Sequence, residues 1–369
     1  MVDHLYKDCE FWIITRDRDL NDLSPYADTY TGQWVKQGKA YVYYIPQHKL
    51  GFTLVRQLLR ETPHDILYLN SFFSRWFSFF PLFLRRFGQL TSATVVLAPR
   101  GELMHGALKL RSLLKNLYFN LVKCLGLHRG LIWHASTSEE AVQITTHSNL
   151  FLPSQLRPSE VFIAPDLLPI KQNLIKRLSA YRPSSELRVV FLSRISPMKN
   201  IDFLLRALTM VKTPIKFFIF GPREDSQYWE LCKKYLENLP PHINVILGED
   251  VRHDQVMNIF AKFDLFAFPT RGENFGHVIF ESLATGTPVL ISDQTPWKQD
   301  KAGSVEILPL IEEKWCAAIE SWSKLTYQEL MSRRAAATSY ANSLSLDTLP
   351  IQKNIALFDL AMQKSSRFV

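Results

Sequence analysis

The stretch Pro269-Thr-Arg-Gly-Glu-Asn-Phe-Gly-His-Val-Ile-Phe-Glu281 carries the clearest fold signal in this chain of 369 residues. It follows the apolar run Asp264–Phe268, which predicts a buried strand. Gly272 and Gly276 indicate a tight loop, and the apolar pattern after them indicates a helix over Phe275–Ala284. A strand, a glycine-containing loop and a helix in this order are typical of a parallel sheet built from βαβ units.

The same alternation of short apolar runs and helical patterns extends over the whole chain. Most runs are solid rather than alternating, as expected of strands that are covered on both faces. In the first half we predict strands at Phe11–Thr15, Ala40–Tyr44, Asp65–Leu69, Thr94–Ala98, Leu131–His134 and Val161–Ala164. In the second half we predict them at Arg188–Leu192, Lys216–Phe220, Asn244–Leu247, Asp264–Phe268, Pro288–Ile291 and Val305–Leu308. The helical patterns include Ala107–Leu125, Ile201–Val211, Gln227–Leu236 and Leu349–Met362.

About six strands therefore occur twice, and a Pro-containing polar stretch separates the two halves. This pattern predicts an α/β protein with two Rossmann-like domains, whose parallel sheets face each other across a cleft. We place the domains at residues 1–168 and 188–345, with a linker at 169–187 and a C-terminal helix at 346–369 that packs back on the first domain. The start, Val2–Cys9, has the pattern of a helix end. The first βα unit of the N-terminal domain is therefore expected to be missing.

Composition narrows the class of protein. Hydrophobic residues make up 47% and charged residues 21%, which excludes a disordered chain. The four cysteines lie far apart without a CxxC pair, which argues against a disulfide scaffold or a zinc module and fits a reducing cytoplasm. The longest aromatic-apolar run, Trp76–Leu84, is far shorter than the roughly 20 residues that span a bilayer.

The net charge of +8 is concentrated in one segment, residues 72–130. Glu102 is the only acid there, and the basic residues are Arg75, Arg85, Arg86, Arg100, Lys109, Arg111, Lys115, Lys123 and Arg129. Such a patch indicates an anionic partner, such as a membrane surface, a phosphorylated lipid or a nucleic acid. No nucleic-acid recognition module is visible, so we expect peripheral association with an anionic membrane. Within this segment, Phe72–Phe87 fits either a buried helix or an interfacial helix.

Two loops carry candidate binding groups. A helix that starts after Gly276 favours a phosphate, and Glu273 and Glu281 can hold hydroxyls of different parts of one ligand. The alternative is an ordinary helix cap with a solvated glutamate. In Leu192–Asn200, Arg194 and Lys199 follow a strand end, where two cations can neutralise a diphosphate without a metal. The alternative there is a pair of surface cations.

These motifs together resemble family 4 retaining glycosyltransferases of the GT-B fold, of the bacterial cell-envelope polysaccharide type. The donor-site signature of that family, a Glu-x7-Glu motif, is matched by Glu273 and Glu281, followed by Gly286-Thr-Pro288 and Ser292–Trp297. Arg194 and Lys199 match the pair that binds the donor diphosphate. In the first half, Ala98-Pro-Arg-Gly-Glu-Leu103 resembles the acceptor-side loop, and Trp133–Glu139 resembles the strand and helix start that follow it.

The resemblance implies transfer of a sugar from a nucleotide diphosphate sugar to a lipid-linked or cell-envelope glycan, with retention at the anomeric carbon. It makes residues 1–168 the acceptor side and 188–345 the nucleotide-sugar side. It implies that Glu273 contacts the sugar and that Arg194 and Lys199 stabilise the leaving diphosphate. The further donor-binding residues that it implies are Glu281, Gly276, His277 and Val278. We also predict donor binding by Asn274 and Phe275, and by Gly221, which follows the strand Lys216–Phe220 and gives a third loop on the same edge. Arg100 and Glu102 are the acceptor-side candidates, and neither a metal nor another cofactor is expected.

The sequence departs from the family pattern at three places, and it also allows a metal site and two other functions. Asn200 replaces a common glycine, Arg100 replaces a common histidine, and the opening strand with its Gly-Gly loop is missing. Asp17-Arg-Asp19 matches the DxD pattern of a metal site, although a solvated loop explains it as well. The other functional readings are a GT-B-like nucleotide-sugar epimerase and a truncated, inactive relative that binds nucleotide. We expect a cytoplasmic location, peripheral on the inner face of the cell membrane.

Overall fold

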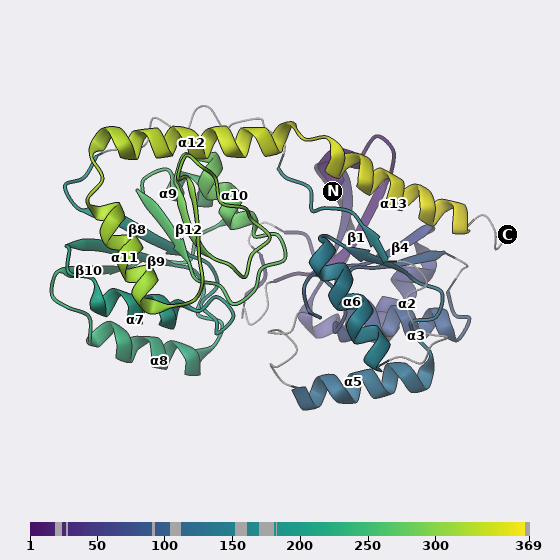
Figure 1. The fold of residues 1–369 in the computed structure, drawn as a ribbon. Coiled ribbons are helices and arrows are strands. Elements are labelled where there is room, and N and C mark those ends of the chain that lie inside the picture. The colour runs from purple at the N-terminus through teal and green to yellow at the C-terminus, as the bar shows by residue number, and fades with distance from the viewer. Residues whose placement is uncertain are drawn as a thin grey trace. The chain divides into compact units, whose positions relative to one another are not determined.

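The computed structural model describes residues 1–18, 24–26, 29–90, 93–103, 112–151, 161–169, 181 and 183–365. The chain forms two compact units (Figure 1). The N-terminal unit consists of Met1–Ile170 together with Thr348–Val369, and the C-terminal unit consists of Lys171–Asp347.

The C-terminal unit is built on one six-stranded sheet in which every pair of neighbours is parallel. The strands are β8 (Leu187–Leu192), β9 (Ile215–Phe220), β10 (Ile243–Leu247), β11 (Leu265–Phe268), β12 (Val289–Ser292) and β13 (Val305–Leu308). Their order is β10-β9-β8-β11-β12-β13, so the chain winds outward from β8 in one direction and from β11 in the other. All six predicted strands are confirmed. The point where the strand order reverses, between β8 and β11, is where open α/β sheets bind ligands.

Helices follow the strands of this sheet and bury their apolar faces. They are α7 (Ile201–Met210), α8 (Ser226–Glu237), α9 (His253–Phe260), α10 (His277–Ala284), α11 (Glu312–Ser323) and α12 (Tyr327–Leu346). Local side chains set where they begin: Asp225 accepts a hydrogen bond from the N–H of Tyr228 at the start of α8, and Thr326 and Glu329 form a capping box on α12. Every residue of β11 and β12 is buried, as the solid apolar runs predict.

The N-terminal unit contains two sheets within its described residues. The first holds β1 (Phe11–Arg16), β2 (Trp34–Gln37) and β3 (Ala40–Ile45) in the order β1-β3-β2. The second holds β4 (Ile66–Leu69), β5 (Thr94–Leu97), β6 (Ile132–Ala135) and β7 (Val161–Ile163) in that order. The six predicted strands are confirmed, but β2 was not predicted. It pairs antiparallel with β3 through a turn in which Gly38 has a φ of 59°.

The single parallel sheet expected for this half is divided between β1 and β4. Among the described residues, β1 pairs only with β3 and β4 only with β5. The two strands nevertheless share a hydrophobic cluster, because Ile14 of β1 and Leu67 of β4 both pack against the buried group that includes side chains of β3 and α2 (Phe52–Glu61). Side-chain packing therefore joins the two sheets where no backbone ladder does.

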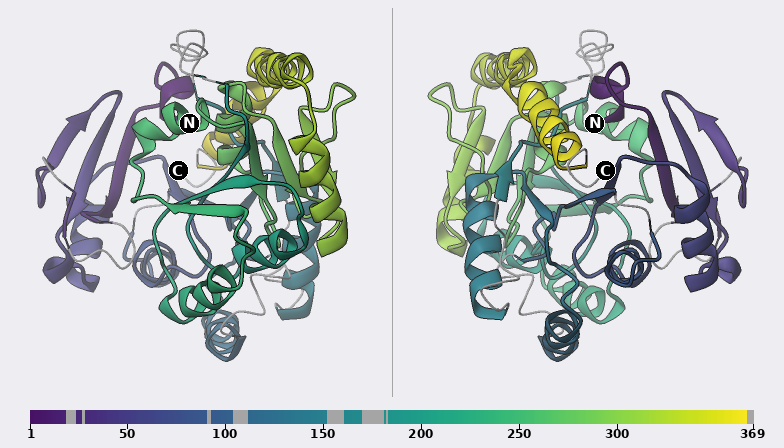
Figure 2. Two further views of the ribbon diagram at one scale, coloured as in Figure 1. Left: turned by 90° about the vertical axis from the view of Figure 1, so that its left-hand side faces the viewer. Right: turned by 90° about the vertical axis from the view of Figure 1, so that its right-hand side faces the viewer.

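The N-terminal unit also contains helices and helical turns outside these sheets. They are α1 (Val2–Leu5), the 3-10 turn η1 (Gln47–Lys49), the π-helical turn η2 (Arg75–Phe79), α3 (Phe80–Arg86), α5 (Ser112–Leu125), α6 (Ser138–Phe151) and α13 (Leu349–Ser365). Helix α13 packs on β4 and β5 (Figures 1 and 2). Its Leu357 and Ala361 share a buried cluster with Val96 of β5 and Ile132 of β6.

The aromatic segment Phe72–Phe87 is part of the core, so the buried-helix interpretation holds. Phe72, Leu82 and Leu84 are at most 2% exposed, and Phe72 packs on Trp133. Phe87, at the end of α3, is half exposed. Among the described residues, none of the helices has the length and apolar character needed to cross a membrane.

Candidate functional site

Three loops meet at the carboxyl ends of β8, β9 and β11 in the C-terminal unit. Backbone hydrogen bonds join the β8 loop to the β9 loop, since Ser193 N–H donates to the carbonyl of Phe220 at 3.2 Å and Ile195 N–H donates to that of Pro222 at 2.8 Å. Another joins it to the β11 loop, where Arg271 N–H donates to the Met198 carbonyl at 2.8 Å. The loops therefore form one connected edge at the point where the strand order reverses.

Gly221 allows the β8 and β9 loops to approach each other this closely. Its φ is +125°, and a Cβ atom at this position would lie 2.0 Å from the carbonyl oxygen of Ser193. No other residue fits without moving the backbone, so Gly221 shapes the edge through its missing side chain rather than through a functional group.

Asn200 links the β8 and β11 loops. It precedes α7 with a φ of +61°, a left-handed conformation that asparagine adopts more readily than most residues. Its buried amide donates to the Pro269 carbonyl at 2.9 Å, and its Oδ1 accepts from Nε of Arg271 at 2.9 Å. Asparagine thus tolerates the backbone conformation for which glycine is common here, and it adds two contacts.

Lys199 and Glu273, both predicted as catalytic, form a direct ion pair. The Nζ atom of Lys199 lies 2.6 Å from Oε1 and 2.9 Å from Oε2 of Glu273. The side chains are 12% and 13% exposed, and the ammonium lies 5.4 Å from the ring centroid of Phe268. A charge pair shielded to this degree is held firmly, because water competes weakly for either partner.

Arg194 lies in the same loop but is open to solvent. Its side chain is 60% exposed, and Nη1 contacts both carboxylate oxygens of Glu224 at 3.1 and 3.3 Å. Glu224 was not singled out from the sequence, although it follows Gly221-Pro222 in the β9 loop. An exposed guanidinium restrained at one nitrogen keeps other donors for an incoming anion.

The N-terminus of α10 adds backbone donors to this edge. Gly276 precedes the helix with a φ of +81°, where a Cβ would lie 2.9 Å from Cγ of Glu273. His277 and Val278 form the first turn, whose positive dipole end favours negative charge. The carbonyl of Phe275 accepts from the indole of Trp297 at 2.5 Å, which fixes the loop before the helix.

Glu281 projects from the second turn of α10 and is 9% exposed at its side chain. Burial raises its pKa, and the imidazole of His253, whose Nδ1 lies 3.7 Å from Oε1, opposes that rise. His253 begins α9 and was missed by sequence reasoning, because nothing local marks it. Nearby in sequence, the Oδ1 atom of Asn274 is buried with no hydrogen-bond donor among the residues that the structure describes. Both groups are suited to accept hydrogen bonds from hydroxyls of a ligand.

The acceptor-side candidates belong to the N-terminal unit, at the carboxyl ends of its strands. Arg100 has a φ of +54°, forms a salt bridge with Asp166, and donates to Asn70 Oδ1 at 2.7 Å and to the Tyr68 hydroxyl at 2.9 Å. These partners come from the ends of β4 and β7, so the guanidinium is positioned at the sheet edge. Its role toward an acceptor stays a prediction.

Glu102 anchors its own loop. Its carboxylate accepts from the N–H groups of Phe72 and Phe73 at 2.6 and 3.0 Å and from the hydroxyl of Ser71 at 2.9 Å. Three donors from one segment explain the presence of a carboxylate at this position, and contact with an acceptor remains a prediction.

His134 is buried beneath the Arg100 contacts. Its Nδ1 accepts from the Tyr68 hydroxyl at 2.5 Å, and its Nε2 donates to the carbonyl of Ala164 at 2.8 Å. Burial lowers its pKa to about 4, so the ring is neutral at physiological pH. These contacts agree with a structural role for this histidine.

Of the Asp17-Arg-Asp19 pattern, Asp19 lies outside the described residues. Asp17 is buried and bonded to Nε of Arg18 at 2.8 Å, a contact that lowers the pKa of its carboxyl. Among the described residues, no three histidine, cysteine or acidic side chains come together as metal ligands would. Independence from a metal stays a prediction.

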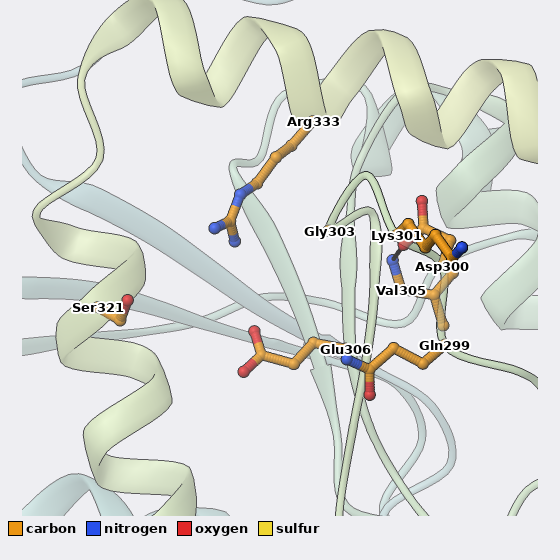
Figure 3. A pocket seen from close by; sticks show the side chains of 8 residues that line it. All are labelled: Gln299, Asp300, Lys301, Gly303, Val305, Glu306, Ser321 and Arg333. Carbon is orange, nitrogen blue, oxygen red and sulfur yellow. Dashed lines mark hydrogen bonds between the residues drawn. The ribbon is translucent and has the colours of Figure 1, made fainter.

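A polar pocket of about 470 Å³ lies at β13, α11 and α12 (Figure 3). None of the residues predicted to bind the donor is among those that line it. Its lining residues are Gln299, Asp300, Lys301, Gly303, Val305, Glu306, Ser321 and Arg333.

Solved structures identify the fold as GT-B. The structure of Alr3699/HepE from Anabaena in complex with UDP-glucose superimposes with a TM-score of 0.62 at 16% identity, over 86% of this chain and 86% of that one. The structure of WaaG, a glycosyltransferase involved in lipopolysaccharide biosynthesis, gives a TM-score of 0.59 at 16% identity, over 87% of this chain and 88% of that one.

Sequence comparison is informative for the C-terminal unit. Residues 177–300, which include all three loops and Glu281, match the family of glycosyl transferases group 1. A D-inositol 3-phosphate glycosyltransferase of Segniliparus rotundus is 30% identical over 144 residues. That match covers 37% of this chain and 32% of the relative, so the similarity extends over about a third of the relative's length.

Proposed function

We propose that the protein is a retaining glycosyltransferase, which moves a sugar from a nucleotide diphosphate sugar to a lipid-linked or cell-envelope glycan. The observation that carries this proposal is the Lys199–Glu273 pair, held at the reversal point of the sheet beside the exposed Arg194 and the start of α10. The match of residues 177–300 to glycosyl transferases group 1 supports it.

The site fits the departure of a diphosphate. As the bond between the anomeric carbon and the phosphate oxygen breaks, its electrons pass to the leaving phosphate. Arg194, Lys199 and the first turn of α10 supply positive charge and N–H donors for this developing anion. The acceptor hydroxyl forms the new bond to carbon and loses its proton to the departing phosphate. No step in this scheme needs a divalent ion, so activity is expected to persist in EDTA.

The carboxylates divide the recognition of the donor. Glu273, fixed by Lys199, accepts hydrogen bonds from hydroxyls of the sugar, and Glu281 accepts them from hydroxyls of the ribose. The buried Oδ1 of Asn274 offers a third acceptor. The related structure of Alr3699/HepE contains UDP-glucose, which supports a nucleotide sugar as the donor.

The charge of the first half supports a membrane-bound acceptor. The segment 72–130 carries nine basic residues and one acid, which favours an anionic surface. We propose that the protein works in the cytoplasm, peripherally on the inner face of the membrane, in the synthesis of polysaccharide or lipopolysaccharide. The role of WaaG in lipopolysaccharide biosynthesis supports this assignment.

A radiolabelled nucleotide-sugar assay, run with and without acceptor lipid and with and without EDTA, tests the proposal. Label that enters the lipid only when acceptor is present, with EDTA making no difference, supports it. Release of an altered sugar without acceptor indicates an epimerase, and nucleotide binding without turnover indicates an inactive relative. Loss of transfer in EDTA and its restoration by Mn²⁺ would instead favour a metal site at Asp17. Lys199→Ala is expected to lower this transfer strongly, and Lys301→Ala, which removes an exposed cation of the same unit, is its control.

A further inference from the structure

Helix α5 (Ser112–Leu125) is apolar on two faces. Its inner face belongs to the core of the N-terminal unit, where Phe119 and Val122 are at most 5% exposed and the Tyr118 hydroxyl donates to the carbonyl of Phe72 at 2.7 Å. Packing of one stripe on the core is ordinary for a surface helix, whose opposite side is expected to be polar.

The outer face of α5 instead carries leucines. Leu113, Leu114, Leu117 and Leu121 are 83%, 65%, 66% and 43% exposed. Their spacing of three, four and seven residues places them on one side of the helix. Single exposed leucines are common, but four on one stripe form an apolar patch that marks an interaction surface.

Basic residues surround the end of this stripe. Lys123 and Arg129 are exposed, and the sequence of α5 contains no aspartate or glutamate. Nη1 of Arg85 donates to the carbonyl of Arg129 at 2.9 Å, which brings the basic end of α3, with the exposed Arg86, beside the loop after α5. The half-exposed Phe87 follows directly in the chain. An apolar stripe bordered by cations has the composition of a helix that lies in the headgroup region of a membrane.

We propose that the leucine stripe of α5 is the surface by which this protein docks on an anionic lipid bilayer. Its leucines enter the boundary between headgroups and acyl chains, while Lys123, Arg129 and Arg86 contact lipid phosphates. A second copy of the chain fits this surface less well. A symmetric pair brings each patch against itself, so these cations would face their own copies.

This inference names the membrane contact that the proposed function requires, and its test uses no sugar transfer. An environment-sensitive fluorophore is attached to Cys124, which is exposed on α5 one turn after Leu121, in a Cys9→Ser/Cys316→Ser background. Vesicles of phosphatidylcholine with about one-third phosphatidylglycerol serve as the probe, with pure phosphatidylcholine for comparison. We expect a blue shift of the emission with the anionic vesicles and a weaker shift as salt is added.

The matched variants separate the stripe from general hydrophobicity. Leu113→Gln/Leu117→Gln is expected to weaken vesicle binding about tenfold or more, because two inserted side chains are lost. Val142→Gln/Leu346→Gln removes two apolar side chains elsewhere that are 65% and 70% exposed, and it is expected to bind as the parent does. Lys123→Glu/Arg129→Glu is expected to weaken binding and to flatten its dependence on salt.

Equal vesicle binding by the leucine variant and the parent would overturn the proposal, as would an unshifted fluorophore at Cys124. A concentration-dependent dimer that the leucine variant abolishes would assign the stripe to a second copy instead. Because these measurements contain no donor or acceptor, a failure of docking is distinguished from a failure of glycosyl transfer.

Discussion

Replacement of Lys199 by methionine tests whether the Lys199–Glu273 pair has a structural role, a chemical role in the proposed donor site, or both. The substitution keeps most of the side-chain volume but removes the ammonium that contacts Glu273 at 2.6 and 2.9 Å. Glu273, whose side chain is 13% exposed, then lacks its partner in a largely desolvated position. Removal of one member of a fully buried pair costs about 3–5 kcal/mol, and the residual exposure here favours the lower figure of about 3 kcal/mol.

For a unit that spans Lys171–Asp347, a loss of about 1 kcal/mol lowers Tm by roughly 2–4 °C. Lys199→Met should therefore lower the Tm of this unit by roughly 6–12 °C. Addition of Glu273→Gln removes the unpaired charge and should restore most of the Tm, since neutral replacement of both partners is nearly neutral for stability. Turnover should respond differently, because a lost charge-assisted contact to the diphosphate costs about 1.5–3 kcal/mol, or roughly tenfold to over a hundredfold.

The assay pairs thermal unfolding with initial-rate measurements on Lys199→Met, Glu273→Gln, the double variant and the control Lys301→Ala. We expect the double variant to regain stability but not turnover. Recovery of turnover in the double variant would mean that the pair only supports the loop. An unchanged Tm and rate in Lys199→Met would refute both parts of the reasoning.

Three further predictions follow from single residues. Gly221→Ala should abolish donor binding in calorimetry, because its Cβ would lie 2.0 Å from the Ser193 carbonyl oxygen. Gly38→Ala, at a positive φ with open space around it, should lower the free energy of unfolding in urea by only about 1 kcal/mol. Arg194→Ala should lower turnover at least tenfold and leave the Tm unchanged, because its side chain is 60% exposed; equal rates would contradict its assignment to the diphosphate. Burial lowers the pKa of His128 from 6.5 to about 3, so the unfolded chain binds the extra proton and stability falls as the pH drops below about 6.5 toward 3. His128→Leu should flatten this loss in urea unfolding between pH 7 and pH 5, and an equally steep loss in the variant would assign the acid sensitivity to other groups.

The sheet of the C-terminal unit was predictable because its central strands β8, β11 and β12 contain solid apolar runs. Strands covered on both faces need no alternation, so runs such as Asp264–Phe268 and Pro288–Ile291 stand out against their polar loops. The position of Arg194 and Lys199 at the sheet edge followed from chain order alone, since every loop after a parallel strand ends at the same edge.

Contacts between distant segments were beyond prediction. Lys199 and Glu273 are 74 residues apart, and both were predicted in the donor site, but no local pattern indicates that they pair with each other. Glu224 and His253 were not predicted for the same reason, because their partners Arg194 and Glu281 lie far away in the sequence. Strand β2 (Trp34–Gln37) was missed because four residues with a mixed pattern at a sheet edge leave little periodicity to detect. The division between β1 and β4 depends on backbone pairing, which apolar patterns do not specify.

Backbone conformation, rather than side-chain charge alone, shapes the proposed donor site. Gly221, Asn200 and Gly276 all have positive φ, and each begins or ends a loop at the same sheet edge. The two glycines adopt a positive φ readily, whereas Asn200 is held there by the bond of its amide to the β11 loop. The Lys199 ammonium is consequently already in place, with Glu273 as its counter-ion. In the proposed reaction an arriving phosphate attracts this ammonium, and the carboxylate becomes available to the sugar hydroxyls. Recognition of the sugar and of the diphosphate would thus be coupled through one ion pair.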